Sequence, residues 1–238
     1  MKTSSWSTDP MLARGSAVVA RDSWQGRLDQ PPAPSLVSSA SSPGQSPKQP
    51  TAEADWPFDG RDIFHRLMQH AAGRGNDHAY ACMIASRCGG QGALPDWLGL
   101  ESAAFGCLMR WHFPGVELGG AVATGARLAA ERMEEVADLV RILLMDKAGD
   151  SPSEVWMAHV IAAGCCGDDH LWQDLGLWDR AELTALMQRN FPALASRNVK
   201  DMKWKRFLYK QLCESEGIYS CRAPSCGQCV DYHACFSP

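Results

Sequence analysis

The chain has 238 residues, of which 45% are apolar, and this is enough material for one sizeable globular domain or two small ones. Its formal net charge of −4 gives no electrostatic reason to expect nucleic acid or an anionic membrane as a partner. Residues 1–50 contain no continuous apolar run as long as a signal peptide or a membrane span, so we expect a cytoplasmic protein.

The N-terminal part of the chain is rich in Ser, Pro, Gln and Gly, as in the run Gln30–Ser35. Such a composition cannot bury enough apolar surface to offset the chain entropy that folding removes. We therefore predict a disordered tail over residues 1–54. A partner-docking arm would be the functional alternative, but no sharp motif in these residues supports it.

From Trp56 onward the apolar residues recur at spacings of three and four, and no stretch alternates for long enough to predict a strand. This pattern predicts an all-α domain over residues 55–216, built as an irregular helical bundle with short connections. The expected helices span residues 62–72, 77–87, 100–112, 127–147, 153–165, 179–189 and 201–214. Ser151 followed by Pro152 is typical of a helix start, because the hydroxyl can cap a free amide and Pro suits the first turn.

Ten cysteines are many for a reducing compartment, where they indicate metal binding or redox chemistry rather than structural disulfides. Six of them are scattered through helical sequence and are predicted to pack in the core, since free cysteine is among the most buried residue types. These six are Cys82, Cys88, Cys107, Cys165, Cys166 and Cys213.

The other four cysteines follow the pattern C-x4-C-x2-C-x5-C, at Cys221, Cys226, Cys229 and Cys235. The C-x2-C pair brings two thiolates to one centre across a tight turn, which Gly227 accommodates. The first three spacings equal those of plant-type ferredoxins, whereas a four-thiolate zinc site more often has two separate C-x2-C pairs. We therefore predict a C-terminal Cys-rich metal-binding loop over residues 217–238, with an iron–sulfur cluster favoured over zinc.

Lys203, Arg206 and Lys210, together with Lys200, gather on one side of the helix expected at residues 201–214, and apolar residues occupy the other side. This basic face is either a solvated helix surface or a region that attracts an anionic cluster, an oxyanion such as molybdate, or an acidic partner.

The sequence shows no sign of an enzyme. The Gly-rich run at residues 119–125 lacks both a Lys-Ser/Thr pair and a preceding strand, so it is predicted to be a loop rather than a nucleotide site. No constellation of nucleophile and base is evident from the spacing of the residues.

The run Gly164–Leu177 reads GCCGDDHLWQDLGL and is too distinctive for a generic helix. It occurs together with Phe191–Ala195, Asn198, Asp201–Phe207, Leu212–Glu214 and the four-cysteine run. This combination resembles the NifQ family of nitrogen-fixation proteins. The resemblance covers most of residues 151–238 and extends more weakly back to about residue 58.

The resemblance implies a carrier of a cluster that contains molybdenum, iron and sulfur and is held by Cys221, Cys226, Cys229 and Cys235. Such a carrier donates molybdenum for biosynthesis of the nitrogenase iron–molybdenum cofactor. The implied partners are cofactor-assembly proteins, a scaffold and a reductase, as molybdenum acceptors, and molybdate or a sulfur-bound molybdenum source as the supply. No nucleic acid and no membrane are implied.

Four cysteines can ligate only part of a mixed cluster. Cys213, Asp231, His233 and His170 are candidates for the remaining positions, although each is more simply explained as an ordinary structural or surface residue, and His170 is expected to cap or support a helix. The same four thiolates also fit two other functions. One is a ferredoxin-like iron–sulfur electron carrier, which would contain no molybdenum, and the other is a zinc-stabilised interaction module.

Overall fold

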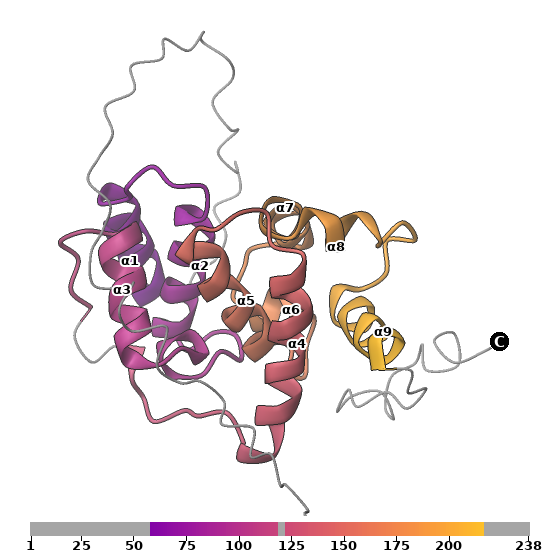
Figure 1. Ribbon diagram of the computed structural model, residues 1–238. Coiled ribbons are helices and arrows are strands. Elements are labelled where there is room, and N and C mark those ends of the chain that lie inside the picture. Colours follow the sequence, from indigo (N-terminus) through magenta and orange to yellow (C-terminus); the bar gives the residue numbers. More distant parts are fainter. Residues whose placement is uncertain (1–57, 119–121, 217–238) are drawn as a thin grey trace, which may run out of the picture. The chain divides into compact units, whose positions relative to one another are not determined.

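The computed structural model describes residues 58–118 and 122–216, and the regular elements in these residues are all helices (Figure 1). This confirms the all-α class. In chain order the elements are α1 Phe58–Gln69, α2 Asp77–Cys88, η2 Asp96–Gly99, α3 Ser102–His112, η4 Ala130–Arg132, α4 Met133–Met145, α5 Pro152–Gly164, α6 Leu171–Asp174, α7 Arg180–Asn190, α8 Pro192–Ser196 and α9 Trp204–Glu216.

Two parts of the predicted organisation lie outside the described residues, the tail at residues 1–54 and the Cys-rich segment at residues 217–238. They stay predictions. Within the described part of the chain, no helix is both long enough and apolar enough to cross a membrane.

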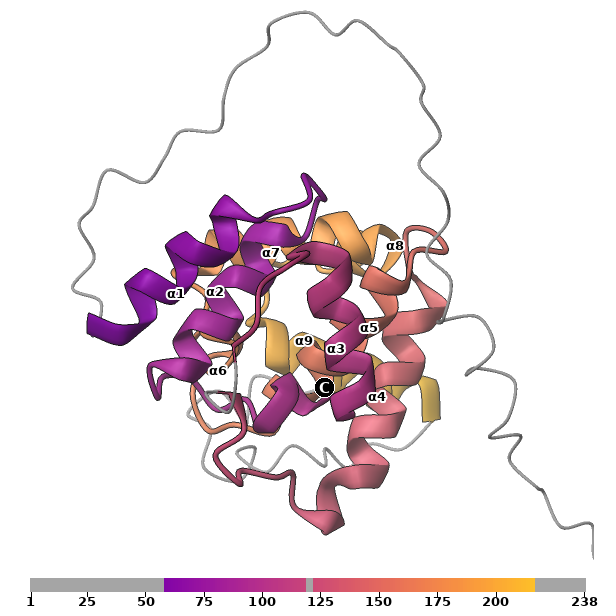
Figure 2. The ribbon, with the colours of Figure 1, turned by 90° about the vertical axis from the view of Figure 1, so that its left-hand side faces the viewer.

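Helices α2 and α5 are buried over most of their length. Both have small or apolar residues at nearly every position, and a helix that is apolar all round must be covered on all sides. Helix α1 packs against α2, and α5 is covered by α4, α3 and α6 (Figures 1 and 2). The core of the described residues therefore surrounds these two helices.

Helices α4 and α9 are amphipathic and pack against each other. On α4, Val136, Leu139 and Leu143 are buried, whereas Arg141 is exposed. On α9 the buried residues are Trp204, Phe207, Leu208, Tyr209 and Leu212. Each fully buried aliphatic or aromatic side chain contributes roughly 1.5–3 kcal/mol, so this packing fixes α9 on the helical body.

The predicted start of α5 is confirmed, because Ser151 Oγ accepts a hydrogen bond from the Ser153 amide at 3.2 Å and Pro152 occupies the first turn. The predicted start of α9 at Asp201 is wrong by three residues. The Asn198 side chain closes a turn on Met202, from whose amide it accepts at 2.9 Å. Asp201 has a φ of +47°, which lies outside the right-handed α region.

Other boundaries also differ from the expected ones. Helix α4 begins at Met133 rather than at residue 127, and the short elements α6 and α8 were not expected at all. Helices of four or five residues present too few positions for a periodic pattern.

Candidate functional site

The predicted ligands Cys221, Cys226, Cys229 and Cys235 lie outside the described residues, as do Asp231 and His233. The nearest described element is α9, which ends at Glu216, five residues before Cys221. The way in which α9 is held therefore determines where the segment with the four cysteines begins.

Lys205 ties α9 to the distinctive run Gly164–Leu177. Its Nζ donates to the Gly167 carbonyl oxygen at 2.7 Å and forms an ion pair with the Asp174 carboxylate. The Lys205 side chain is 15% exposed and that of Asp174 is 3% exposed. Burial raises the pKa of Asp174, and the hydrogen bond and charge of Lys205 oppose that shift. The pair is therefore a desolvated contact rather than a surface salt bridge.

Tyr209, one helical turn further along α9, belongs to a second buried polar cluster. Its hydroxyl donates to the carboxylate of Glu135 on α4 and also lies 3.4 Å from the Cys165 carbonyl oxygen. Arg132 completes the cluster through an ion pair with Glu135, with Nε and Oε2 2.6 Å apart. Burial raises the pKa of Tyr209, which keeps the phenol protonated as a donor. The sequence analysis missed this cluster because its members come from three distant segments.

The glycines of the run Gly164–Leu177 are needed for close packing. A Cβ at Gly167 would come within 2.4 Å of the Asp174 carboxyl group. Gly176 has a φ of +71°, and a Cβ there would lie 2.4 Å from the Ser86 Cβ. The run folds as the end of α5, a tight turn and α6. Lys205 binds α9 to this run, which we call the seat of α9.

His170 lies at the start of α6, as expected for a helix-capping residue. Its backbone amide donates to the Gln173 Oε1 at 3.3 Å, and its side chain is exposed. Cys213, the other described candidate for a further ligand, is half-buried on α9.

The prediction of core packing is confirmed for five of the six scattered cysteines. Cys82 and Cys165 are buried in the core, and Cys88, Cys107 and Cys166 are half-buried and pack against it. Cys213 is half-buried as well. Burial raises the pKa of Cys166 above that of an ordinary thiol, although the nearby Arg132 opposes the shift.

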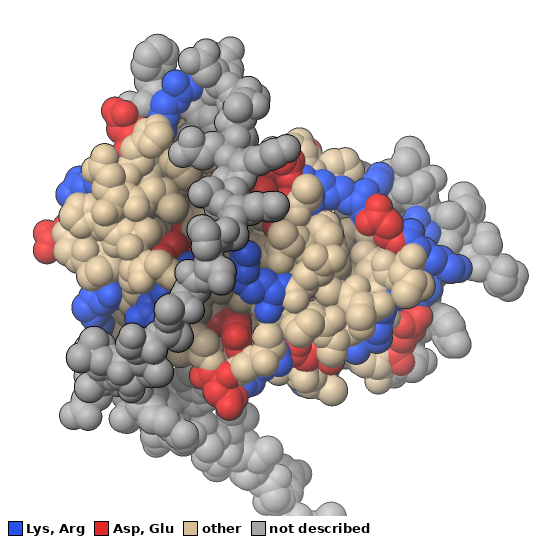
Figure 3. Space-filling model, turned by 90° about the horizontal axis from the view of Figure 1, so that it is seen from above, with Lys and Arg blue, Asp and Glu red and all other residues tan. Residues whose placement is uncertain are grey.

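The predicted basic face is smaller than expected. Lys200 and Lys203 precede α9, because the helix begins only at Trp204. Lys203 and Lys210 are exposed, but Arg206 is half-buried, and Lys210 Nζ lies 3.6 Å from Glu214 Oε1. On the side of the molecule shown in Figure 3, Lys and Arg side chains are interspersed with Asp and Glu.

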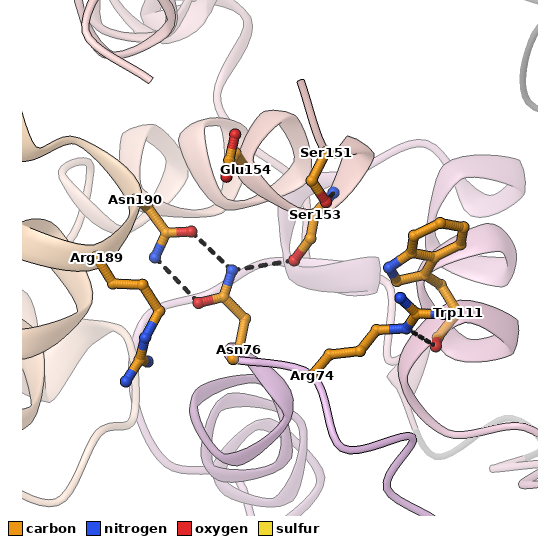
Figure 4. Close-up of a pocket in the computed structure, with 9 residues that line it drawn as sticks. Arg74, Asn76, Trp111, Ser151, Ser153, Glu154, Arg189 and Asn190 are labelled. Atoms are coloured by element: carbon orange, nitrogen blue, oxygen red, sulfur yellow. Dashed lines mark hydrogen bonds between the residues drawn. The ribbon is translucent and has the colours of Figure 1, made fainter. Parts of the chain in front are cut away.

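A cavity of about 150 Å³ lies where the start of α5 meets the end of α7 (Figure 4). Arg74 and Arg189 lie on its two sides, and the Arg74 guanidinium stacks on the Trp111 ring at 4.0 Å. The two guanidinium groups favour an anion in this cavity, whereas the Glu154 carboxylate that also lines it opposes one. The charge of the cavity therefore does not select a ligand.

Ser153, which lines the cavity, belongs to a chain of hydrogen bonds with Asp77 and His112. His112 Nδ1 lies 2.5 Å from Asp77 Oδ1, and its Nε2 lies 2.9 Å from Ser153 Oγ. Asn76 donates to the same Ser153 oxygen at 3.0 Å and exchanges hydrogen bonds with Asn190 (Figure 4).

This Ser–His–Asp order was not foreseen from the sequence, which showed no constellation of nucleophile and base. All of its side chains are buried, and the Ser153 hydroxyl is engaged by two partners at once. The network ties α2, α3, α5 and α7 together.

One group of ligand-type side chains converges within residues 58–118 and 122–216, namely His78, Cys82 and Glu182. None of the three was predicted to bind a metal, and Cys82 was expected only to pack in the core. The signal that could have found the pair is the H-x3-C spacing, which places both side chains on one face of a helix.

The described residues define an all-α protein whose last helix is docked on the run Gly164–Leu177 and leads toward a four-cysteine sequence. The family model described as NifQ matches residues 79–237, which include this run and all four cysteines. The chain therefore belongs to the NifQ family, a family of nitrogen-fixation proteins.

Individual relatives agree with this assignment. Protein NifQ of Azotobacter vinelandii is 45% identical in an alignment of length 166, and the match covers 65% of this chain and 84% of the relative. Protein NifQ of Klebsiella pneumoniae is 40% identical in an alignment of length 157, and the match covers 62% of this chain and 90% of the relative. Protein NifQ of Rhodobacter capsulatus is 34% identical over 152 residues, 63% of this chain and 81% of the relative. No solved structure gives a significant match to the chain.

Proposed function

We propose that this protein carries a cluster of molybdenum, iron and sulfur and donates molybdenum for biosynthesis of the nitrogenase iron–molybdenum cofactor. The proposed ligands are Cys221, Cys226, Cys229 and Cys235. The observation that carries the proposal is that this C-x4-C-x2-C-x5-C run lies inside the residues matched by the NifQ family model. Soft thiolate and sulfide ligands suit both iron–sulfur clusters and molybdenum that has been drawn out of its oxyanion form.

The anchoring of α9 supports the proposal. Lys205 and Tyr209 bind α9 to the run Gly164–Leu177 and to α4 through buried contacts, which fix the position of Glu216. The first proposed ligand follows five residues later. A rigid helix directly before a ligand segment lowers the entropy that the segment loses when it closes around a cluster.

The proposed acceptors are the scaffold and the reductase of the cofactor-assembly machinery, in the cytoplasm, and the proposed supply is molybdate or a sulfur-bound molybdenum source. Lys203 and Lys210 are exposed where α9 begins and along it, so they can steer an anionic supply or an acidic acceptor. A carrier needs no catalysis, so we propose that this protein is not an enzyme.

Metal and sulfide analysis of the protein, purified without oxygen from molybdate-fed cells, tests the proposal. We expect iron, sulfide and molybdenum together. Iron and sulfide without molybdenum would instead indicate the ferredoxin-like electron carrier, and a colourless protein containing only zinc would indicate the interaction module. Cys229→Ala should lose most of the metal, whereas the matched control Cys88→Ala, on α2, should keep it.

A further inference from the structure

We propose that His78 and Cys82 of α2, together with Glu182 of α7, form a second metal site, for a divalent transition-metal ion such as Fe²⁺ or Zn²⁺. None of its three ligands belongs to the cysteine run near the C-terminus, and the proposal does not rest on the proposed carrier function.

The three ligand atoms lie close to the spacing of a tetrahedral site. His78 Nδ1 lies 3.6 Å from Cys82 Sγ and 3.7 Å from Glu182 Oε1, and all three atoms lie within 4.8 Å of one another. Bonds of about 2.3 Å to sulfur and about 2.0–2.1 Å to nitrogen or oxygen would place tetrahedral ligands roughly 3.3–3.6 Å apart. Small side-chain movements therefore suffice to bind an ion.

The backbone positions of the three residues also suit a metal. His78 and Cys82 are four residues apart on α2, the same separation with which the two histidines of an H-E-x-x-H helix bind one zinc ion. Glu182 lies in the first turn of α7 and supplies the third ligand from a different helix. Because the ligands come from two helices, a bound ion would hold α2 and α7 together.

Neighbouring groups orient the ligands as the surroundings of metal sites usually do. Glu182 Oε2 accepts a hydrogen bond from the Trp178 amide at 3.0 Å, so that Oε1 is directed toward His78. The His78 ring makes edge contacts with the rings of Trp178 and Phe64, at centroid distances of 4.9 and 5.4 Å. These contacts hold the imidazole with Nδ1 facing the other two ligands.

Access and charge are also suitable. The Cys82 side chain is buried, but 44% of the His78 side chain is exposed, so an ion can enter from the His78 side and water can occupy the fourth position. On binding, the Cys82 thiol gives its proton to solvent and the metal keeps its oxidation state. The thiolate and the carboxylate then balance the two positive charges of the ion.

The mixed sulfur, nitrogen and oxygen donors decide the class of ion. Thiolate and imidazole are poor ligands for Mg²⁺ and Ca²⁺, which prefer oxygen, and they suit borderline metals such as Fe²⁺, Co²⁺ and Zn²⁺. Without a metal, the same residues would make only a partly exposed His–Glu contact beside a buried thiol.

A cobalt titration of the full-length chain tests the site. The starting protein carries the substitutions Cys221→Ser, Cys226→Ser, Cys229→Ser and Cys235→Ser, which remove the four thiolates of the proposed cluster. We expect it to bind one Co²⁺ per chain with the absorption of a thiolate–cobalt bond, and Zn²⁺ to displace the cobalt. Adding Cys82→Ser should abolish this absorption. Glu182→Gln should weaken binding by about 100-fold or more, since residues that only orient a ligand already contribute about 10–100-fold.

Cys88→Ser and Cys166→Ser are the matched controls, since both thiols are half-buried in the same helical body. Both controls should bind cobalt as the starting protein does. The absence of a thiolate–cobalt band in the starting protein, or an equal band after Cys82→Ser, would overturn the proposal. If Cys82→Ser loses its helical circular dichroism, the Glu182→Gln variant tests the site instead, because glutamine can still accept a hydrogen bond from the Trp178 amide. Unchanged cobalt affinity in Glu182→Gln would also overturn the proposal.

Loss of molybdenum donation in the protein with the four Cys→Ser substitutions, with the cobalt site intact, would show that donation depends on the four cysteines and not on this site. Failure of the proposed carrier function would instead appear as no molybdenum donation by the wild type, and it would leave the cobalt site unaffected.

Discussion

Replacing Lys205 by Met should uncouple α9 from its seat while preserving the aliphatic part of the side chain. The substitution leaves the Asp174 carboxylate, which is 3% exposed, without its ion-pair partner. Removing one member of a buried pair costs about 3–5 kcal/mol, because the remaining charge cannot be solvated. This is a large part of the roughly 5–15 kcal/mol by which domains are stable.

The double variant Lys205→Met, Asp174→Asn should recover most of this loss. Its free energy of unfolding should lie within about 1–2 kcal/mol of the wild-type value, since removing both members of a buried ion pair is often neutral. Asparagine is the right replacement because it has the shape of aspartate, and the space beside Gly167 admits nothing larger. Its side-chain oxygen can also accept from the Asp169 amide, as Asp174 does at 3.4 Å.

Urea unfolding followed by circular dichroism gives the free energies, and amide hydrogen exchange locates the effect. In the single variant, exchange should accelerate more in α9 than in the central helix α2. A single variant that loses less than about 1 kcal/mol, or a double variant no more stable than the single one, would refute the role of Lys205 as a buried anchor.

Three further predictions follow from the polar networks and from the basic face. Ser153→Ala should lower the free energy of unfolding by about 1–3 kcal/mol in urea titrations, because the buried donor of Asn76 then loses a partner; a smaller loss would mean that the site relaxes. Burial lowers the pKa of His112 below its ordinary 6.5 although Asp77 opposes the shift, so the unfolded chain binds a proton more readily than the folded protein. The free energy of unfolding should therefore fall as the pH drops below about 6.5, by at most about 1.4 kcal/mol per pH unit. His112→Gln should reduce this dependence on pH. An equal dependence in the wild type and the variant would contradict the role given to His112. The double variant Lys203→Glu, Lys210→Glu should slow molybdenum loading or transfer at low salt, and the defect should be smaller at high salt. Arg66→Glu on α1 is the control. Normal rates of the double variant at low salt would show that the basic face is only a solvated surface.

Much of the fold could be predicted from the sequence because the long helices carry a clear apolar period. The helix expected at residues 77–87 coincides with α2 within one residue, and Ser151 with Pro152 marks the start of α5. The start of α9 was predicted wrongly because a local side-chain contact overrides the helical spacing of the apolar residues. Asn198 holds Met202 in a turn and delays α9 to Trp204, a contact that the spacing of apolar residues does not encode.

The candidate sites were harder to predict for a different reason. The four cysteines near the C-terminus are close in sequence, so spacing alone indicates shared ligation. His78 and Cys82 are also close in sequence, but their third partner, Glu182, is about a hundred residues away and joins them only through the packing of α7. Lys205 and Asp174 likewise meet only when α9 docks. Contacts of this kind depend on tertiary structure, which a single sequence does not reveal.

Molybdenum transfer is the most direct test of the central claim. The loaded protein and its Cys226→Ser, Cys229→Ser variant, prepared side by side without oxygen, would be mixed with cofactor-assembly scaffold that lacks molybdenum, and molybdenum on the re-isolated scaffold would be counted. We predict that the wild type delivers molybdenum and that the variant, which has lost two of the four proposed thiolates, delivers little or none. Equal delivery by both proteins, or none by a wild type that contains molybdenum, would contradict the account.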